Sequence, residues 1–118
     1  MNNSKDMAKI AVNALEAKKG EEIKIIDIRK VSVLADYFII AHGNNTNQVQ
    51  AMADHVEEEL YKAGYTCRQK EGYGSGSWIL MDYGDIIVHA FDKEDRLFYD
   101  LERIWRDGVI VESVEQLP

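Results

Sequence analysis

The chain has 118 residues, a length typical of one domain, and 46% of them are apolar and 30% charged, as in ordinary globular proteins. Its net charge of −7 argues against extensive direct contact with nucleic acid and favours a basic protein as partner. Because Cys67 is the single cysteine, no intramolecular disulfide can form, which fits a reducing compartment. We interpret Cys67 as a small apolar residue. The sequence has no signal peptide and no apolar run of the ~20 residues that a membrane span needs, so we expect a cytoplasmic protein with no membrane partner.

The first half of the chain predicts two helices around two buried strands. A helix over 5–19 follows Ser4 as N-cap and ends at Gly20, which can adopt a left-handed backbone. An isoleucine-rich strand over 22–30 carries apolar residues on both sides, which indicates cover on both faces. After a turn or short helical piece over 31–34, a second buried strand over 37–41 ends in a polar loop. Asn45 or Thr46 then caps a helix that Gly64 ends.

The second half predicts three strands and a last helix. Residues 65–71 are moderately typical of a strand, and the glycines of 72–76 form a loop. Two strands over 77–82 and 85–91 are joined by a tight turn and pair antiparallel. Asp92 caps a helix that ends at Gly108, after which 109–111 is expected to add a short strand and the acidic end to fray.

The order of these elements indicates the fold class. Strands and helices intermix without strict alternation, which favours a mixed sheet over a purely parallel one. We therefore predict a single domain over residues 1–118 of the α/β or α+β class. It should hold a mixed, mostly five-stranded sheet and about three main helices.

Three aspartates, Asp82, Asp85 and Asp92, are the candidate metal ligands. A site for metal-assisted chemistry needs carboxylates that converge on one point. Alternate residues along a strand are ~6 to 7 Å apart, which would separate Asp85 and Asp92 by roughly 20 Å. The spacing predicts turn and cap carboxylates, with no metal and no other cofactor.

The histidines also fit structural roles. His89 lies within a strand, on the same face as Ile87 and Phe91, and no carboxylate or nucleophile is placed beside it as a general base would need. His42 ends a strand, where ligand-binding loops often lie, although loop polarity is the simpler interpretation. His55 is predicted on the solvated side of its helix.

The glycines of 72–76 superficially resemble a phosphate-binding loop. Such a loop needs Gly-x-x-x-x-Gly-Lys-Ser/Thr at the start of a helix. Here no lysine follows, and the next element is a strand. We interpret the segment as a flexible connector that becomes ordered on a partner.

The strand that begins at Trp78 is the candidate protein-binding segment. Its two faces carry Trp78 and Leu80 on one side, and Ile79, Met81 and Tyr83 on the other. If the sheet is covered on one side only, one of these sets is exposed, and Trp and Tyr are the usual anchors of interfaces. Asp82 would complement a basic partner. The alternative is that Trp78 is an ordinary core residue, and the spacing alone does not decide between the two.

Several segments together resemble the ribosomal silencing factor family, also called the Iojap or RsfS family. The matching segments are ADYFIIA at 35–41, QVQAMAD at 48–54, EG at 71–72, WILMDYGDIIVHAF at 78–91 and RLFYDLERIW at 96–105. They span almost the whole chain, and the run from Trp78 to Trp105 is the most specific of them.

The resemblance implies a protein that is not an enzyme and that has a nucleotidyltransferase-like fold. It implies binding to the large ribosomal subunit through ribosomal protein fourteen of that subunit, with little direct contact to nucleic acid. The bound factor would block the small subunit sterically and restrain translation when nutrients are short. We also expect a homodimer when the protein is free of the ribosome. The predicted binding residues are Trp78, Leu80, Met81, Asp82, Tyr83, Arg96 and Tyr99.

The rival hypothesis is a divergent nucleotidyltransferase or another nucleotide-binding protein that uses the loop at 42–45. In the nucleotidyltransferase superfamily, a Gly-Ser loop follows a strand and paired carboxylates hold metal. This sequence has Gly43-Asn44-Asn45 at that place, and no Asp-x-Asp follows. The resemblance therefore predicts that the catalytic groups are absent.

Overall fold

The computed structural model describes residues 3–30, 33, 35–94 and 109–111. In chain order, the elements are α1 (Ser4–Ala17), β1 (Glu21–Asp27), β2 (Tyr37–Gly43), α2 (Thr46–Lys62), β3 (Gln69–Glu71), β4 (Trp78–Asp82), β5 (Ile86–Asp92) and β6 (Val109–Val111). The third predicted helix, after Asp92, falls almost entirely on residues outside the described ranges.

All six strands join one mixed sheet, in the order β3-β4-β5-β2-β1-β6. Strands β2 and β5 pair in parallel, and the other described pairs are antiparallel. The mixed α+β architecture is confirmed, and β6 extends the five main strands at the edge of β1. The strand expected over 65–71 is shorter than predicted, because only Gln69–Glu71 pairs with β4.

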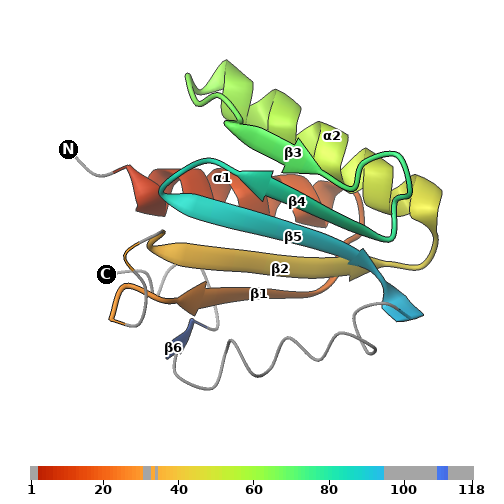
Figure 1. The fold of residues 1–118 in the computed structure, drawn as a ribbon, viewed down its shortest axis with the longest axis horizontal. Coiled ribbons are helices and arrows are strands. Elements are labelled where there is room, and N and C mark those ends of the chain that lie inside the picture. The colour runs from red at the N-terminus through yellow and green to blue at the C-terminus, as the bar shows by residue number, and fades with distance from the viewer. Residues whose placement is uncertain (1–2, 31–32, 34, 95–108, 112–118) are drawn as a thin grey trace.

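Both helices pack on one face of the sheet, behind the strands in the view of Figure 1. The main core lies between the helices and the sheet, and its large members include Leu15, Ile39, Met52, Leu60, Ile79 and Met81. We call the opposite face of the sheet the outer face. It carries a second buried cluster of Ile26, Ile28, Ala35, Ile40 and Phe91, with Phe38, Trp78 and Ile87 packed against it. The central strands thus bury apolar side chains on both faces of the sheet, as predicted for β1.

The ends of α1 differ from the prediction. Ser4 is already helical and buried, and Asn3 occupies the N-cap position without a side-chain hydrogen bond. At the C-terminal end, Lys19 N–H donates to the Glu16 carbonyl at 2.9 Å and Gly20 N–H to the Leu15 carbonyl at 2.8 Å. This is the double hydrogen bond of a Schellman motif, and it places Lys19, with φ 61°, at the left-handed position expected for Gly20.

Replacing Lys19 by glycine should therefore stabilise the protein by about 0.5 to 1 kcal/mol, because a side chain at positive φ is strained and glycine is not. Urea unfolding followed by circular dichroism would measure this change. Lys18→Gly is the matched control: the neighbouring lysine has φ −102°, so glycine there should destabilise. Equal effects of the two substitutions would contradict this assignment of the helix end.

The ends of α2 follow the prediction. The Asn45 side chain accepts a hydrogen bond from Gln48 N–H at 2.8 Å, which makes Asn45 the N-cap. Gly64, with φ 96°, follows the helix in the left-handed conformation. Of the residues described, none forms a helix that is long and apolar enough to cross a membrane.

Candidate protein-binding surface

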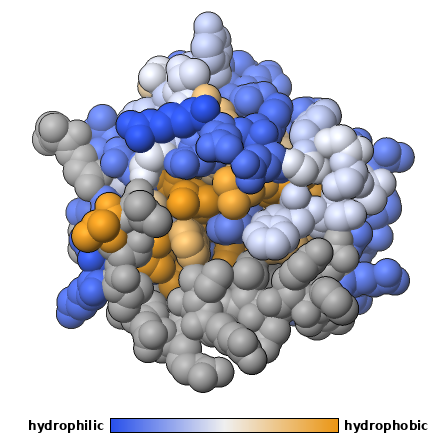
Figure 2. All heavy atoms as spheres, viewed as in Figure 1, coloured by the Kyte–Doolittle hydropathy of each residue, from blue (hydrophilic) through white to orange (hydrophobic). Residues whose placement is uncertain are grey.

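The two faces of β4 differ in burial, as its alternation predicts. Ile79 and Met81 lie in the main core and are fully buried. Trp78, Leu80 and Asp82 alternate with them on the outer face, and each remains partly exposed. Figure 2 looks onto this face and shows hydrophobic residues across its middle, with hydrophilic residues along its upper edge. The outer face of β4 therefore offers an aromatic, an aliphatic and an acidic side chain to a partner.

Met81 and Tyr83, by contrast, are buried in the free protein. Met81 is 0% exposed and Tyr83 is 4% exposed, and both belong to the core under the helices. Burial also raises the pKa of Tyr83, which keeps its hydroxyl neutral. In the free protein they support β4 from the side of the helices, and their contact with a partner stays a prediction.

Asp82 combines a structural role with its surface position. Its Oδ1 accepts a hydrogen bond from Gly84 N–H at 2.7 Å, within the turn between β4 and β5. Tyr83 N–H donates to the Ile86 carbonyl at 3.0 Å and closes the same turn. A lysine at position 82 would therefore disturb the turn as well as reverse the charge.

Trp78 is held on the outer face by neighbours from β5. Its ring stacks on Phe91 with 5.0 Å between centroids, and its Nε1–H donates to Nδ1 of His89 at 3.1 Å. Phe38 of β2 meets the His89 ring edge-on, with centroids 5.0 Å apart. Trp78 is accordingly neither plain core nor free surface: one side of the indole is packed and another remains accessible.

His89 is the functional candidate that the sequence analysis did not assign. It is 5% exposed, and burial lowers its pKa to about 4, so the ring is neutral at physiological pH. The signal was present in the sequence, since Trp78 and His89 fall on the same face of the hairpin once its register is known. In that register Trp78 pairs with Phe91 and Leu80 with His89, which makes Trp78 and His89 diagonal neighbours.

The glycine loop before β4 is tied to α2. Tyr73 Oη donates to Asp54 Oδ2 at 3.0 Å, and the Gln50 side chain donates to the Tyr73 carbonyl at 2.8 Å. Gly72 and Gly76 have positive φ values of 80° and 67°. The segment expected to be a free connector thus has specific turns and two side-chain anchors.

The polar groups of the loop after β2 are already engaged. His42 is buried, with its Nε2 3.1 Å from Glu21 Oε2. Asn44 N–H donates to Gln48 Oε1 at 2.7 Å, and Asn45 caps α2. A nucleotide phosphate would have to displace these hydrogen bonds, so the geometry does not favour the nucleotide-binding hypothesis.

The described part of the chain contains no group of three or more His, Cys, Asp or Glu side chains placed to hold a metal ion. The Sγ of Cys67 lies 3.3 Å from the carbonyl oxygen of Gln69, and burial raises the pKa of the thiol. A protonated thiol is a poor nucleophile and a poor metal ligand. These groups therefore provide no basis for assigning catalysis.

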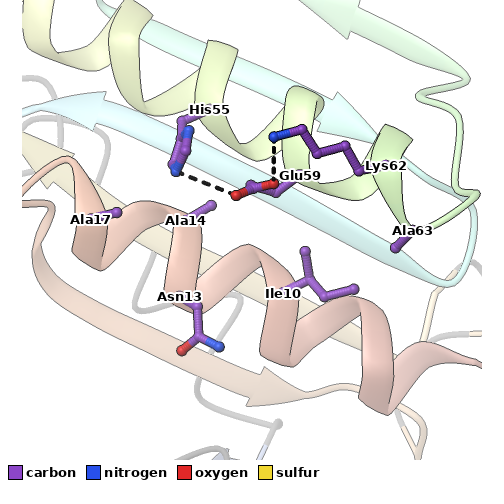
Figure 3. A pocket seen from close by; sticks show the side chains of 8 residues that line it. All are labelled: Ile10, Asn13, Ala14, Ala17, His55, Glu59, Lys62 and Ala63. Atoms are coloured by element: carbon purple, nitrogen blue, oxygen red, sulfur yellow. Dashed lines mark ion pairs between the residues drawn. The ribbon is translucent and has the colours of Figure 1, made fainter.

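A groove between α1 and α2 is shown in Figure 3; it is lined by Ile10, Asn13, Ala14 and Ala17 of α1 and by His55, Glu59, Lys62 and Ala63. His55 is only 22% exposed, which corrects the prediction that it is solvated, and its Nε2 lies 3.9 Å from Glu59. Lys62 Nζ also lies 3.5 Å from Glu59. The charges of this groove are thus paired with one another, and no feature singles out a ligand.

Arg96 and Tyr99, the last two predicted binding residues, lie outside the described ranges. The structure therefore brings together Trp78, Leu80 and Asp82 from the predicted set, and adds His89 beneath Trp78.

Comparison with known proteins gives consistent results. The family model described as "Ribosomal silencing factor during starvation" matches residues 1–117. Ribosomal silencing factor RsfS of Bacillus subtilis is 38% identical over 110 residues, which are 93% of each chain. A crystal structure of a Chromobacterium violaceum protein superposes with a TM-score of 0.86 and 33% identity, over 98% of both chains.

A more distant relative has a longer chain. It is the mouse protein named "Mitochondrial assembly of ribosomal large subunit protein 1", 29% identical over 99 residues. The match covers 80% of this chain and 42% of the mouse protein.

Proposed function

Because the chain belongs to the ribosomal silencing factor family, we propose that it binds the large ribosomal subunit and represses translation under nutrient limitation. The observation that carries this proposal is the family match over residues 1–117. The mouse relative, whose name refers to the large subunit, supports the choice of subunit.

The proposed mechanism is steric. The protein docks on ribosomal protein fourteen of the large subunit and covers a surface that the small subunit needs for joining. The net charge of −7 supports a protein contact, since acidic groups are repelled by RNA phosphates and attracted to a basic ribosomal protein.

The proposed docking surface is the outer face of β4. Trp78 supplies an aromatic anchor, Leu80 apolar area and Asp82 a negative charge. Met81 and Tyr83 hold the strand from behind, and Arg96 and Tyr99 remain proposed contact residues. A large aromatic side chain that is already ordered loses little conformational entropy on binding, which favours affinity.

We propose that the protein acts in the cytoplasm, without catalysis or a cofactor. We also propose that it forms a homodimer when it is not bound to the ribosome. The hydrogen bonds that His42, Asn44 and Asn45 form within the protein argue against the rival nucleotide-binding role.

The test is co-sedimentation with purified large subunits kept apart from small subunits at low Mg²⁺. We expect the protein to pellet with large subunits and not with small ones. Raising Mg²⁺ in its presence should then slow subunit joining, as followed by light scattering. A protein that neither pellets with large subunits nor slows joining would refute the proposed function.

A further inference from the structure

His89 and Trp78 form a pair on the outer face that the proposed docking role does not by itself require. The Trp78 Nε1–H points at His89 Nδ1, 3.1 Å away. The Phe91 ring stacks on the indole, and the Phe38 ring meets the imidazole edge-on. The Phe91 ring and one directed hydrogen bond to His89, itself held by Phe38, thus favour a single orientation of the partly exposed indole.

The hydrogen bond determines the chemical state of His89. Indole can only donate a hydrogen bond, so Nδ1 must be the unprotonated acceptor and Nε2 must carry the proton. That Nε2 is buried and has no hydrogen-bond partner among the described residues. A buried donor without a partner costs free energy, so packing alone would favour an apolar residue at position 89. The acceptor function of Nδ1 is what an apolar residue cannot replace.

The surroundings keep this histidine neutral. Its cross-strand neighbours are Leu80 on β4 and Ile40 on β2, both apolar. The charged residues of the outer face around it in the described strands are Asp82, paired with Ile87, Lys24 of β1, paired with Ile40, and Glu71 of β3, paired with Leu80. None of the three lies directly opposite His89, and burial accounts for its lowered pKa.

We propose that His89 is a positioning residue, whose neutral imidazole fixes the indole of Trp78 in the orientation that a partner meets. The consequence for ribosome binding rests on the proposed function, whereas the positioning itself is a property of the free protein. Losing the acceptor would free the indole rotamer, and the cost of ordering it again on binding should weaken affinity about tenfold.

The test compares three variants. In His89→Asn, the amide oxygen lies two bonds beyond Cβ, as Nδ1 does, and can accept the same hydrogen bond. In His89→Gln, the amide lies one bond further out, near the position of Nε2. In His89→Phe, the ring shape is kept and the acceptor is lost. The matched set therefore separates the acceptor from packing and from polarity.

The first measurement is the Trp78 indole N–H signal in ¹H–¹⁵N NMR spectra of the free protein, assigned with Trp78→Phe. We expect native protein and His89→Asn to show a downfield, slowly exchanging signal. His89→Gln and His89→Phe should show an upfield, rapidly exchanging one. An unchanged signal in both of these folded variants would overturn the proposal.

The second measurement is the pH dependence of unfolding. Unfolded His89 titrates near its ordinary pKa of 6.5 and native His89 near 4, so the unfolded state binds the additional proton between these values. Stability should fall as pH decreases through this window, and His89→Asn should lose that part of the dependence. Identical pH profiles would contradict a neutral, buried acceptor.

The third measurement is binding to large subunits, where His89→Asn should match native protein within about twofold and His89→Phe should bind about tenfold more weakly. Equal binding of all variants would overturn the role of positioning in docking. If native protein itself does not bind, the proposed function fails, while the NMR and pH measurements still decide whether His89 positions Trp78.

Discussion

Replacing Trp78 by alanine is expected to weaken binding to large ribosomal subunits by about 2 kcal/mol, or roughly thirtyfold. The substitution removes the one large aromatic side chain on the outer face of β4 that is both ordered and partly exposed. Fluorescence-detected sedimentation with large subunits would measure the loss. The thermal stability of the variant should be measured as well, because the substitution also removes packing against Phe91 and the hydrogen bond to His89.

Tyr61→Ala is the matched control for this experiment. Tyr61 is a large aromatic residue of α2 that is 71% exposed, and it lies on the helical side of the sheet. If exposed aromatic area in general drove binding, both substitutions would weaken it. If Trp78→Ala stays folded and binds as native protein does, the outer face of β4 is not the docking surface.

The second large effect concerns stability. Replacing Gly72 by alanine should destabilise the protein by about 2 kcal/mol or more, for two independent reasons. Its φ of 80° is strained for any residue with a side chain. A Cβ added there would also lie far inside contact distance of the Trp78 carbonyl oxygen. Because that carbonyl belongs to β4, relief of the clash would shift the strand that carries the proposed docking residues. Chemical unfolding would measure the loss.

Gly74→Ala serves as the control in the same loop. A Cβ at Gly74 would meet nothing within 4 Å, and its φ is not positive. Its expected effect is within about 0.5 kcal/mol of zero. A similar loss in both variants would show that the loop tolerates no side chain at all, and the specific clash at Gly72 would then not be the cause.

Much of the fold could be predicted because local signals agreed with the tertiary arrangement. The apolar runs of β2 and β5 are buried on both faces, and the tight turn after Asp82 fixed the antiparallel register of β4 with β5. Asn45 and Gly64 delimit α2 by local hydrogen bonds and backbone preference alone. The end of α1 was mispredicted: the left-handed residue is Lys19, against its intrinsic preference, and Gly20 lies where a Cβ would approach the Leu15 carbonyl and Met52 closely.

For the candidate surface too, the sequence predicted one part and the tertiary structure decided the other. The period of two in β4 by itself separated Trp78 and Leu80 from Ile79 and Met81, and the charge of −7 favoured a basic protein partner. Which of the two faces is buried under the helices depended on where α1 and α2 pack, and this is a long-range property that no local spacing encodes. Only the tertiary structure therefore shows that Met81 and Tyr83 are buried and that His89 accepts a hydrogen bond from the indole of Trp78.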